Sequence, residues 1–168
     1  MSDKILVAYA TKAGSTAEVA EAVGEELREA GTEVDVRLAK DVKNLKPYSA
    51  AILGSGIRMG QLLSDATKFV EKHQEALSQV PVAFFVVCLT MKDDTEENRS
   101  TVEAYLDPVR EMVEPVDIGL FAGVIDHSKL SFPARTMSKA MKVSEGDFRD
   151  WDTIRAWARQ LHDRLAQD

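Results

Sequence analysis

The chain has 168 residues, of which 45% are hydrophobic and 29% charged, as in one domain with a single hydrophobic core. Its formal net charge of -7 excludes general binding to nucleic acid, which favours basic surfaces, and indicates an acidic protein that docks on basic partners. One cysteine excludes an internal disulfide, and three scattered histidines predict no metal site.

The N-terminal residues MSDKILVAYA lack a basic region followed by a long apolar run, so we expect no signal peptide. No apolar stretch reaches the length of a membrane span. The sequence therefore predicts a cytoplasmic protein.

The first half of the chain alternates between predicted strands and helices. The apolar run 4–10 predicts a strand buried on both faces, and helical spacing predicts a helix over 16–30. Alternating residues over 33–39 predict a half-buried edge strand. A short buried strand over 49–55 and a helix over 66–77 follow.

The second half continues this alternation. The run 82–90 is the strongest predicted strand and is expected at the centre of the sheet. A helix over 102–113, a last strand over 118–124 and a closing helix over 154–165 complete the pattern. The segment 126–149 stands outside the pattern as an insertion.

This alternation predicts an α/β fold with three layers, in which helices cover both faces of a five-stranded parallel sheet. The whole chain, 1–168, is expected to form a single domain, because no linker, repeat or low-complexity stretch interrupts it. Ligands of open parallel sheets bind beyond the carboxyl ends of the strands. Those ends are expected at 11–16, 55–60, 90–94 and 123–127.

The segment TKAGST, residues 11–16, follows the first strand directly. A helix start offers free N–H groups and a positive dipole end, which bind anions, and Gly14 lets the backbone approach a ligand closely. Hydroxyl side chains add further donors. Helix capping by a box of Ser15 and Glu18 is the alternative, and the sequence leaves both readings open.

The motifs of other phosphate-binding and hydrolytic proteins are absent from this sequence. Neither Gly-x-x-x-x-Gly-Lys-Ser/Thr nor Gly-x-Gly-x-x-Gly occurs, and no Gly-x-Ser-x-Gly elbow is present. The first loop has neither the acidic residues of a receiver domain nor the cysteine of a phosphatase, and Cys88 is expected to be a small buried residue inside a strand. A phosphate site without a nucleophile favours a bound cofactor that carries its own chemistry.

TKAGST resembles the phosphate loop of flavodoxins, Thr/Ser-x-x-Gly-Asn/Ser-Thr, which holds the FMN phosphate. GSGIRMGQLLSDATKFVEKH resembles the second flavin loop of the flavodoxin branch that contains the menaquinone-dependent protoporphyrinogen oxidases. EGDFRDWDTIRAWARQL resembles the closing helix of that branch. The resemblance covers essentially the whole chain and implies a flavodoxin-like fold with FMN as cofactor.

The resemblance also implies cofactor-binding residues at each strand end. Those expected at the phosphate are Thr11, Lys12, Ala13, Gly14, Ser15 and Thr16. Those expected beside the ring and ribityl chain are Ser55, Gly56, Ile57, Arg58 and Met59, and those on the other side of the ring are Thr90, Met91, Lys92 and Asp93. Those expected near the ring edge are Gly123 and Val124.

Arg58 is the candidate for a catalytic residue. Its guanidinium could hold the electron-rich edge of the reduced ring or a substrate carboxylate, whereas a plain surface arginine would only be solvated. Its place in a glycine-flanked loop favours the functional reading. Neither flavin loop contains the aromatic residues that are typical of electron-carrier flavodoxins. Met59 stands where tyrosine is common in the oxidase branch. Met59 and Met91 fit either soft packing on a ring or ordinary gap-filling.

The insertion is basic in an acidic chain. Residues 128–143 contain no acidic residue and four basic ones, namely Lys129, Arg135, Lys139 and Lys142. They predict either a helix with a solvated basic side or a docking surface for a carboxylated or membrane-bound partner. In the oxidase branch the corresponding segment is longer and more aromatic, and Phe132 is the one aromatic residue here, which weakens the case for a porphyrinogen substrate.

The leading hypothesis is an FMN-binding flavodoxin-like redox protein that transfers electrons through flavin N5, in the branch that resembles the protoporphyrinogen oxidases. Protoporphyrinogen with a quinone acceptor is one example of a substrate pair for this branch, and the short insertion leaves the substrate open. A pure electron carrier and a flavin-free interaction domain are the alternatives. Expected partners are a redox protein or a quinone- or porphyrinogen-type molecule. Peripheral membrane contact and a homodimer are both compatible with the sequence, although no residue pattern requires them.

Overall fold

The computed structural model describes residues 4–11, 14–125 and 146–166. Its main sheet has five parallel strands in the order β2-β1-β3-β5-β6. They are β1 (Lys4–Ala10), β2 (Val34–Leu38), β3 (Tyr48–Arg58), β5 (Val82–Cys88) and β6 (Asp117–Ala122). A short strand, β4 (Gln61–Leu62), pairs antiparallel with the end of β3. The predicted α/β class and five-stranded parallel sheet are confirmed.

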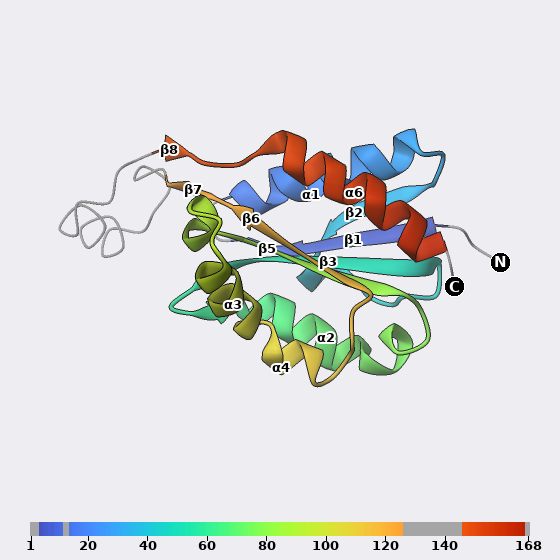
Figure 1. Cartoon of the computed structure of the whole chain (residues 1–168). Helices are drawn as coiled ribbons and strands as arrows, with labels where there is room; N and C mark the ends of the chain where they lie inside the picture. The colour runs from blue at the N-terminus through green and yellow to red at the C-terminus, as the bar shows by residue number, and fades with distance from the viewer. Residues whose placement is uncertain (1–3, 12–13, 126–145, 167–168) are drawn as a thin grey trace.

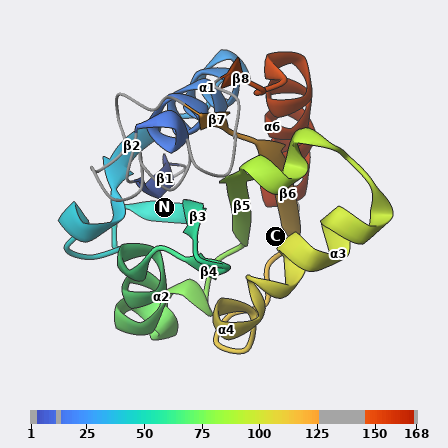
Figure 2. The same cartoon turned by 90° about the vertical axis from the view of Figure 1, so that its left-hand side faces the viewer.

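Helices cover both faces of the sheet, so the fold has the three predicted layers (Figures 1 and 2). One face carries α1 (Ser15–Glu29) and α6 (Trp151–Ala166), and the other carries α2 (Ser64–Leu77), α3 (Glu96–Ala104) and α4 (Asp107–Arg110). Two 3-10 turns are η1 (Ala39–Asp41) and η2 (Leu89–Lys92). A separate antiparallel ribbon consists of β7 (Val124–Ile125) and β8 (Gly146–Asp147).

The core follows from the alternation of side chains along the strands. Ile5 and Val7 join the apolar cluster beneath α1 and α6. Leu6 and Ala8, which point the other way, join the cluster beneath α2, α3 and α4. This two-sided burial explains why β1 and β5 read as continuous apolar runs, whereas β2, at the sheet edge, alternates.

Two predictions about the elements are wrong. The strand over 82–90 is not the centre of the sheet, because β3 lies third of five; β5 is fully buried because strands flank it and helices cover it on both faces. The single helix over 102–113 is two helices. Pro108 in the first turn of α4 has no N–H to donate to a preceding turn, so α3 ends before it.

The basic residues of the insertion and the helix predicted there lie outside the described residues. In the described ranges, no helix combines the length and the apolar character needed to cross a membrane.

Candidate functional site

The carboxyl ends of β1, β3, β5 and β6 meet at one edge of the sheet, which faces the viewer in Figure 2. Ala10 at the end of β1 pairs with Ser55, and Cys88 at the end of β5 pairs with Ala122. The chain places β2 on one side of β1 and all later strands on the other, so the strand order reverses between β1 and β3. Ligands of doubly wound sheets bind at such a switch point.

At this point α1 begins without a side-chain cap. Gly14, which precedes the helix, has φ of 92°, a left-handed conformation that glycine adopts readily, and its N–H donates to Thr11 Oγ1 at 2.9 Å. No side chain in the described ranges accepts a capping bond from the first turn. The start of α1 therefore offers N–H groups to an external acceptor.

The alternative reading of this segment, a capping box, is wrong. Ser15 is the first residue of the helix rather than its cap, and the Glu18 carboxylate accepts a hydrogen bond from Arg149 at 3.0 Å. Lys12 and Ala13, the other predicted phosphate residues of this loop, lie outside the described residues.

The second candidate segment lies against the first. A Cβ built on Gly56 would lie 3.4 Å from Thr16 Oγ1, an ordinary van der Waals distance, so the end of β3 lies next to the first turn of α1. The buried Ser55 hydroxyl donates to the Gly56 carbonyl at 2.6 Å and accepts from the Leu63 N–H at 3.1 Å. Both of its hydrogen-bonding roles are thus occupied, and Ser55 fixes the path from β3 to α2.

Residues 55–58 are strand rather than the predicted loop, because β3 continues to Arg58 and pairs with β4. The turn consists of Met59 at φ 53° and Gly60 at φ 74°, a two-residue hairpin turn with positive φ at both positions. Ile57 is half-buried, whereas Arg58 is exposed and 91% of Met59 is exposed. Arg58 and Met59 therefore lie at a protruding hairpin tip.

The third candidate segment includes η2 and is held by Asn98. Its Nδ2 donates to the carbonyls of Thr90 at 3.3 Å and Asp93 at 2.8 Å, and its N–H donates to Thr95 Oγ1, the cap of α3. Met91 is buried in the core, which fits the gap-filling reading. The segment is therefore anchored by the burial of Met91 in the core and by the hydrogen bonds of Asn98.

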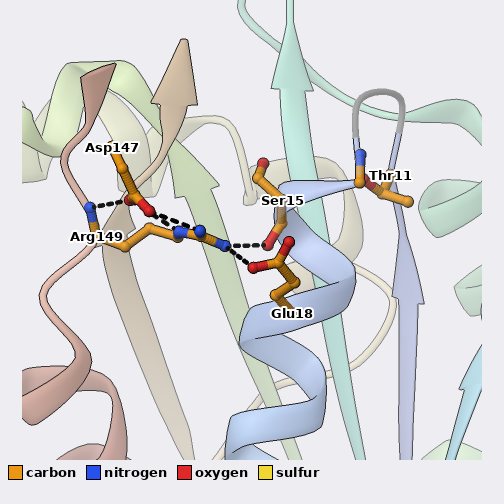
Figure 3. Close-up of polar contacts among 6 residues, drawn as sticks. Thr11, Ser15, Glu18, Asp147 and Arg149 are labelled. Carbon is orange, nitrogen blue, oxygen red and sulfur yellow. Dashed lines mark hydrogen bonds and ion pairs between the residues drawn. The ribbon is translucent and has the colours of Figure 1, made fainter. Parts of the chain in front are cut away.

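The fourth candidate segment contacts residues near the start of α6, and the sequence analysis did not predict this contact. Gly123 follows β6, and Val124 opens β7. The Gly123 carbonyl accepts from the Phe148 N–H at 3.1 Å, and Lys92 Nζ lies 5.1 Å from the centre of the Phe148 ring. The next residue, Arg149, reaches the start of α1 (Figure 3). We call residues 147–149 the strap.

Cys88 is buried, as expected, and desolvation raises the pKa of its thiol above the usual value. A thiol held in its neutral form is a poor nucleophile. The site therefore combines a helix start without a side-chain cap and loops anchored by hydrogen bonds, with Cys88 in a structural role.

These features define a doubly wound α/β protein in which the helix start at the switch point has no side-chain cap. The chain belongs to the Flavodoxin domain family, whose model matches residues 6–152. This membership implies a flavin cofactor and a redox function.

Three similarities extend this result. Protoporphyrinogen IX dehydrogenase [quinone] of Escherichia coli (strain K12) is 27% identical over 172 residues, which cover 94% of each chain. The protein of the same name from Leishmania major is 29% identical over 94% of this chain and 74% of its own length. A flavodoxin from the domain Archaea superposes with a TM-score of 0.58 at 19% identity, over 98% of this chain and 99% of its own, which confirms the fold.

Proposed function

We propose that this chain binds FMN and acts as a flavodoxin-like oxidoreductase. The observation that carries the proposal is the start of α1, which lies at the switch point between β1 and β3 without a side-chain cap. In the part of the chain that the structure describes, a Cβ on Gly14 would meet no atom within 4 Å, so this part leaves the space beside the Gly14 backbone open. A phosphate there would accept the N–H groups of the first turn and gain from the helix dipole.

We assign the phosphate to the loop made of Thr11, Lys12, Ala13, Gly14, Ser15 and Thr16. The ring is assigned between 55–59 and 90–93, with Gly123 and Val124 near its edge. When bound, the flavin supplies the electron transfer itself, through N5. The chain binds and orients it: the hydrogen bonds of Ser55 hold the conformation of the first ring segment, and those of Asn98 hold the conformation of the second.

The relatives support a protoporphyrinogen-type substrate with a quinone acceptor, because two proteins with that name match 94% of this chain. Arg58 is exposed at the end of β3, in one of the two segments assigned to the ring. A pure electron carrier, which would dock a basic partner through the acidic surface, is the second candidate.

The first experiment is purification and an absorption spectrum. We expect a yellow protein with a flavin spectrum that releases FMN on denaturation. We then expect anaerobic oxidation of protoporphyrinogen with a menaquinone analogue as acceptor. A flavin-loaded protein that passes electrons only to other proteins would support the hypothesis of a pure electron carrier. A colourless protein that does not take up FMN would contradict the proposal and favour a flavin-free interaction domain.

Arg58 is proposed to hold the reduced ring's pyrimidine edge or a substrate carboxylate. We expect Arg58→Ala to shift the flavin reduction potential or to raise KM, while the neighbouring exchange Gln61→Ala, at the same hairpin, leaves both nearly unchanged. Spectroelectrochemistry and steady-state kinetics measure the two quantities. Potential and KM that stay at their wild-type values in Arg58→Ala would reject this role.

A further inference from the structure

Arg149 is a buried arginine in the strap that the proposed function does not yet use. Only 8% of its side chain is exposed. Its Nε and Nη2 donate to the two Asp147 carboxylate oxygens at 2.9 and 2.7 Å. Its Nη1 donates to Glu18 Oε2 at 3.0 Å and to the Ser15 carbonyl at 3.4 Å. The guanidinium also lies 4.6 Å from the centre of the Trp151 ring.

These contacts fix the position of the first turn of α1. The hydrogen bonds to Ser15 and Glu18 join this turn to a strap 134 and 131 residues away in sequence. The Asp147 carboxylate binds a second edge of the guanidinium, and the guanidinium lies over the Trp151 ring, so these contacts restrict the movement of the Arg149 side chain. In the view of Figure 3, Arg149 and Thr11 lie on opposite sides of the helix start, so Arg149 supports the turn from behind rather than from the phosphate side.

The same contacts balance charge at this turn. Glu18 lies in the first turn of α1, where its carboxylate would repel a phosphate bound at the same helix end. Arg149 places a positive charge 3.0 Å from that carboxylate. The hydrogen bond from Arg149 lowers the pKa of Asp147 below its usual value, so the strap carboxylate stays ionised and keeps its hold on the guanidinium.

We propose that Arg149 is a positioning residue for the FMN phosphate: it holds the first turn of α1 in its anion-binding position and offsets the charge of Glu18. This inference rests on the proposed binding of FMN. It predicts that the residue contributes to affinity for the phosphate group and not to affinity for the ring. Riboflavin, which has the same ring and no phosphate, separates the two contributions.

The test is titration of the flavin-free full chain with FMN and with riboflavin, followed by quenching of flavin fluorescence. We expect Arg149→Met to weaken FMN binding about tenfold or more and riboflavin binding by less than about threefold. Arg149→Lys, which keeps the charge without the planar fork, should retain part of the preference for FMN. In Glu18→Gln/Arg149→Met, loss of the unpaired carboxylate should restore part of the FMN affinity.

Arg155→Met is the matched control. Arg155 also joins α1 to the C-terminal part of the chain, through Glu25 at 3.1 Å and Glu26 at 3.2 Å, but farther along the helix. We expect it to lower the Tm of the flavin-free protein without changing the ratio of the FMN and riboflavin affinities. A purely structural Arg149 would behave in the same way.

The outcomes separate this inference from the proposed function. If the wild-type chain binds no FMN, both fail. If the wild-type chain binds FMN and Arg149→Met weakens FMN and riboflavin equally, or no more than Arg155→Met does, only the role of Arg149 is overturned.

Discussion

Met59 is the one non-glycine residue in the described ranges with a positive φ, at 53°. It occupies the first position of a two-residue hairpin turn in which asparagine followed by glycine is preferred, and Gly60 already fills the second position. This backbone conformation disfavours methionine, and the residue is 91% exposed, so its burial explains little of its presence here. The proposed ring site beside it accounts for a non-optimal residue here.

We predict that Met59→Asn raises the free energy of unfolding of the flavin-free protein by about 0.5–1 kcal/mol, because asparagine tolerates this conformation. Urea denaturation measures the change. Met59→Ala, which removes the same exposed side chain without asparagine's tolerance, is the control and should give no gain. Equal stability of the two variants would contradict the strain at this position.

At the residue scale, the sequence predicted where the candidate site residues lie better than it predicted their hydrogen-bond partners. The hydroxyls and glycine of 11–16 are placed at the switch point as expected, and Cys88 is buried as expected. Glu18, however, binds Arg149 instead of closing a capping box, and Ser55 uses its hydroxyl within the fold. Local spacing carries no information on a partner 131 residues away.

At the element scale, α2 contains a buried histidine. His73 lies 4.9 Å from the Phe69 ring, and its Nε2 has no hydrogen-bond partner in the described part of the chain. Burial, helped by the positive charge of Lys72, lowers the His73 pKa below the usual 6.5. The folded protein therefore holds this side chain neutral under conditions in which the unfolded chain takes up a proton.

This histidine predicts a loss of stability in mild acid. The contribution of neutral His73 is complete above about pH 6.5 and declines as the pH falls below it, until the folded pKa is passed. We expect the free energy of unfolding to fall less steeply in His73→Leu than in wild type over this range. The half-buried His162, bonded to Thr32 at 2.9 Å, provides the control His162→Gln. Identical slopes in wild type and His73→Leu would refute the assignment.

The sequence predicted the existence of the main elements because their periodicities differ clearly. The apolar runs of β1 and β5 and the helical spacing in α1, α2 and α6 report burial directly. Pro108 is a signal in the sequence from which the break between α3 and α4 can be predicted. The hairpin of β3 and β4 could not be predicted in this way, because Met59 is not a typical turn residue. Sheet position was misjudged because burial does not distinguish β5 from the central β3.

At the scale of the whole molecule, the site depends on contacts between distant segments. The strap joins the start of α1 through Arg149, η2 through Phe148 and the end of β6 through Gly123. Farther along, α6 and α1 are joined by ion pairs of Arg155 and Arg159 with the buried Glu26. Local periodicity encodes neither the strand order nor these contacts between distant segments; the family resemblance supplied the residues of the predicted site.

The affinity difference between FMN and riboflavin in the wild-type chain tests the central claim most directly, since it isolates the phosphate at the start of α1. If the helix start and the surrounding hydroxyls bind the phosphate dianion, FMN should bind at least about 100-fold more tightly than riboflavin, a difference in binding free energy of about 2.7 kcal/mol. Equal affinity for the two flavins would contradict the phosphate site, and absence of binding to either would contradict the proposed function.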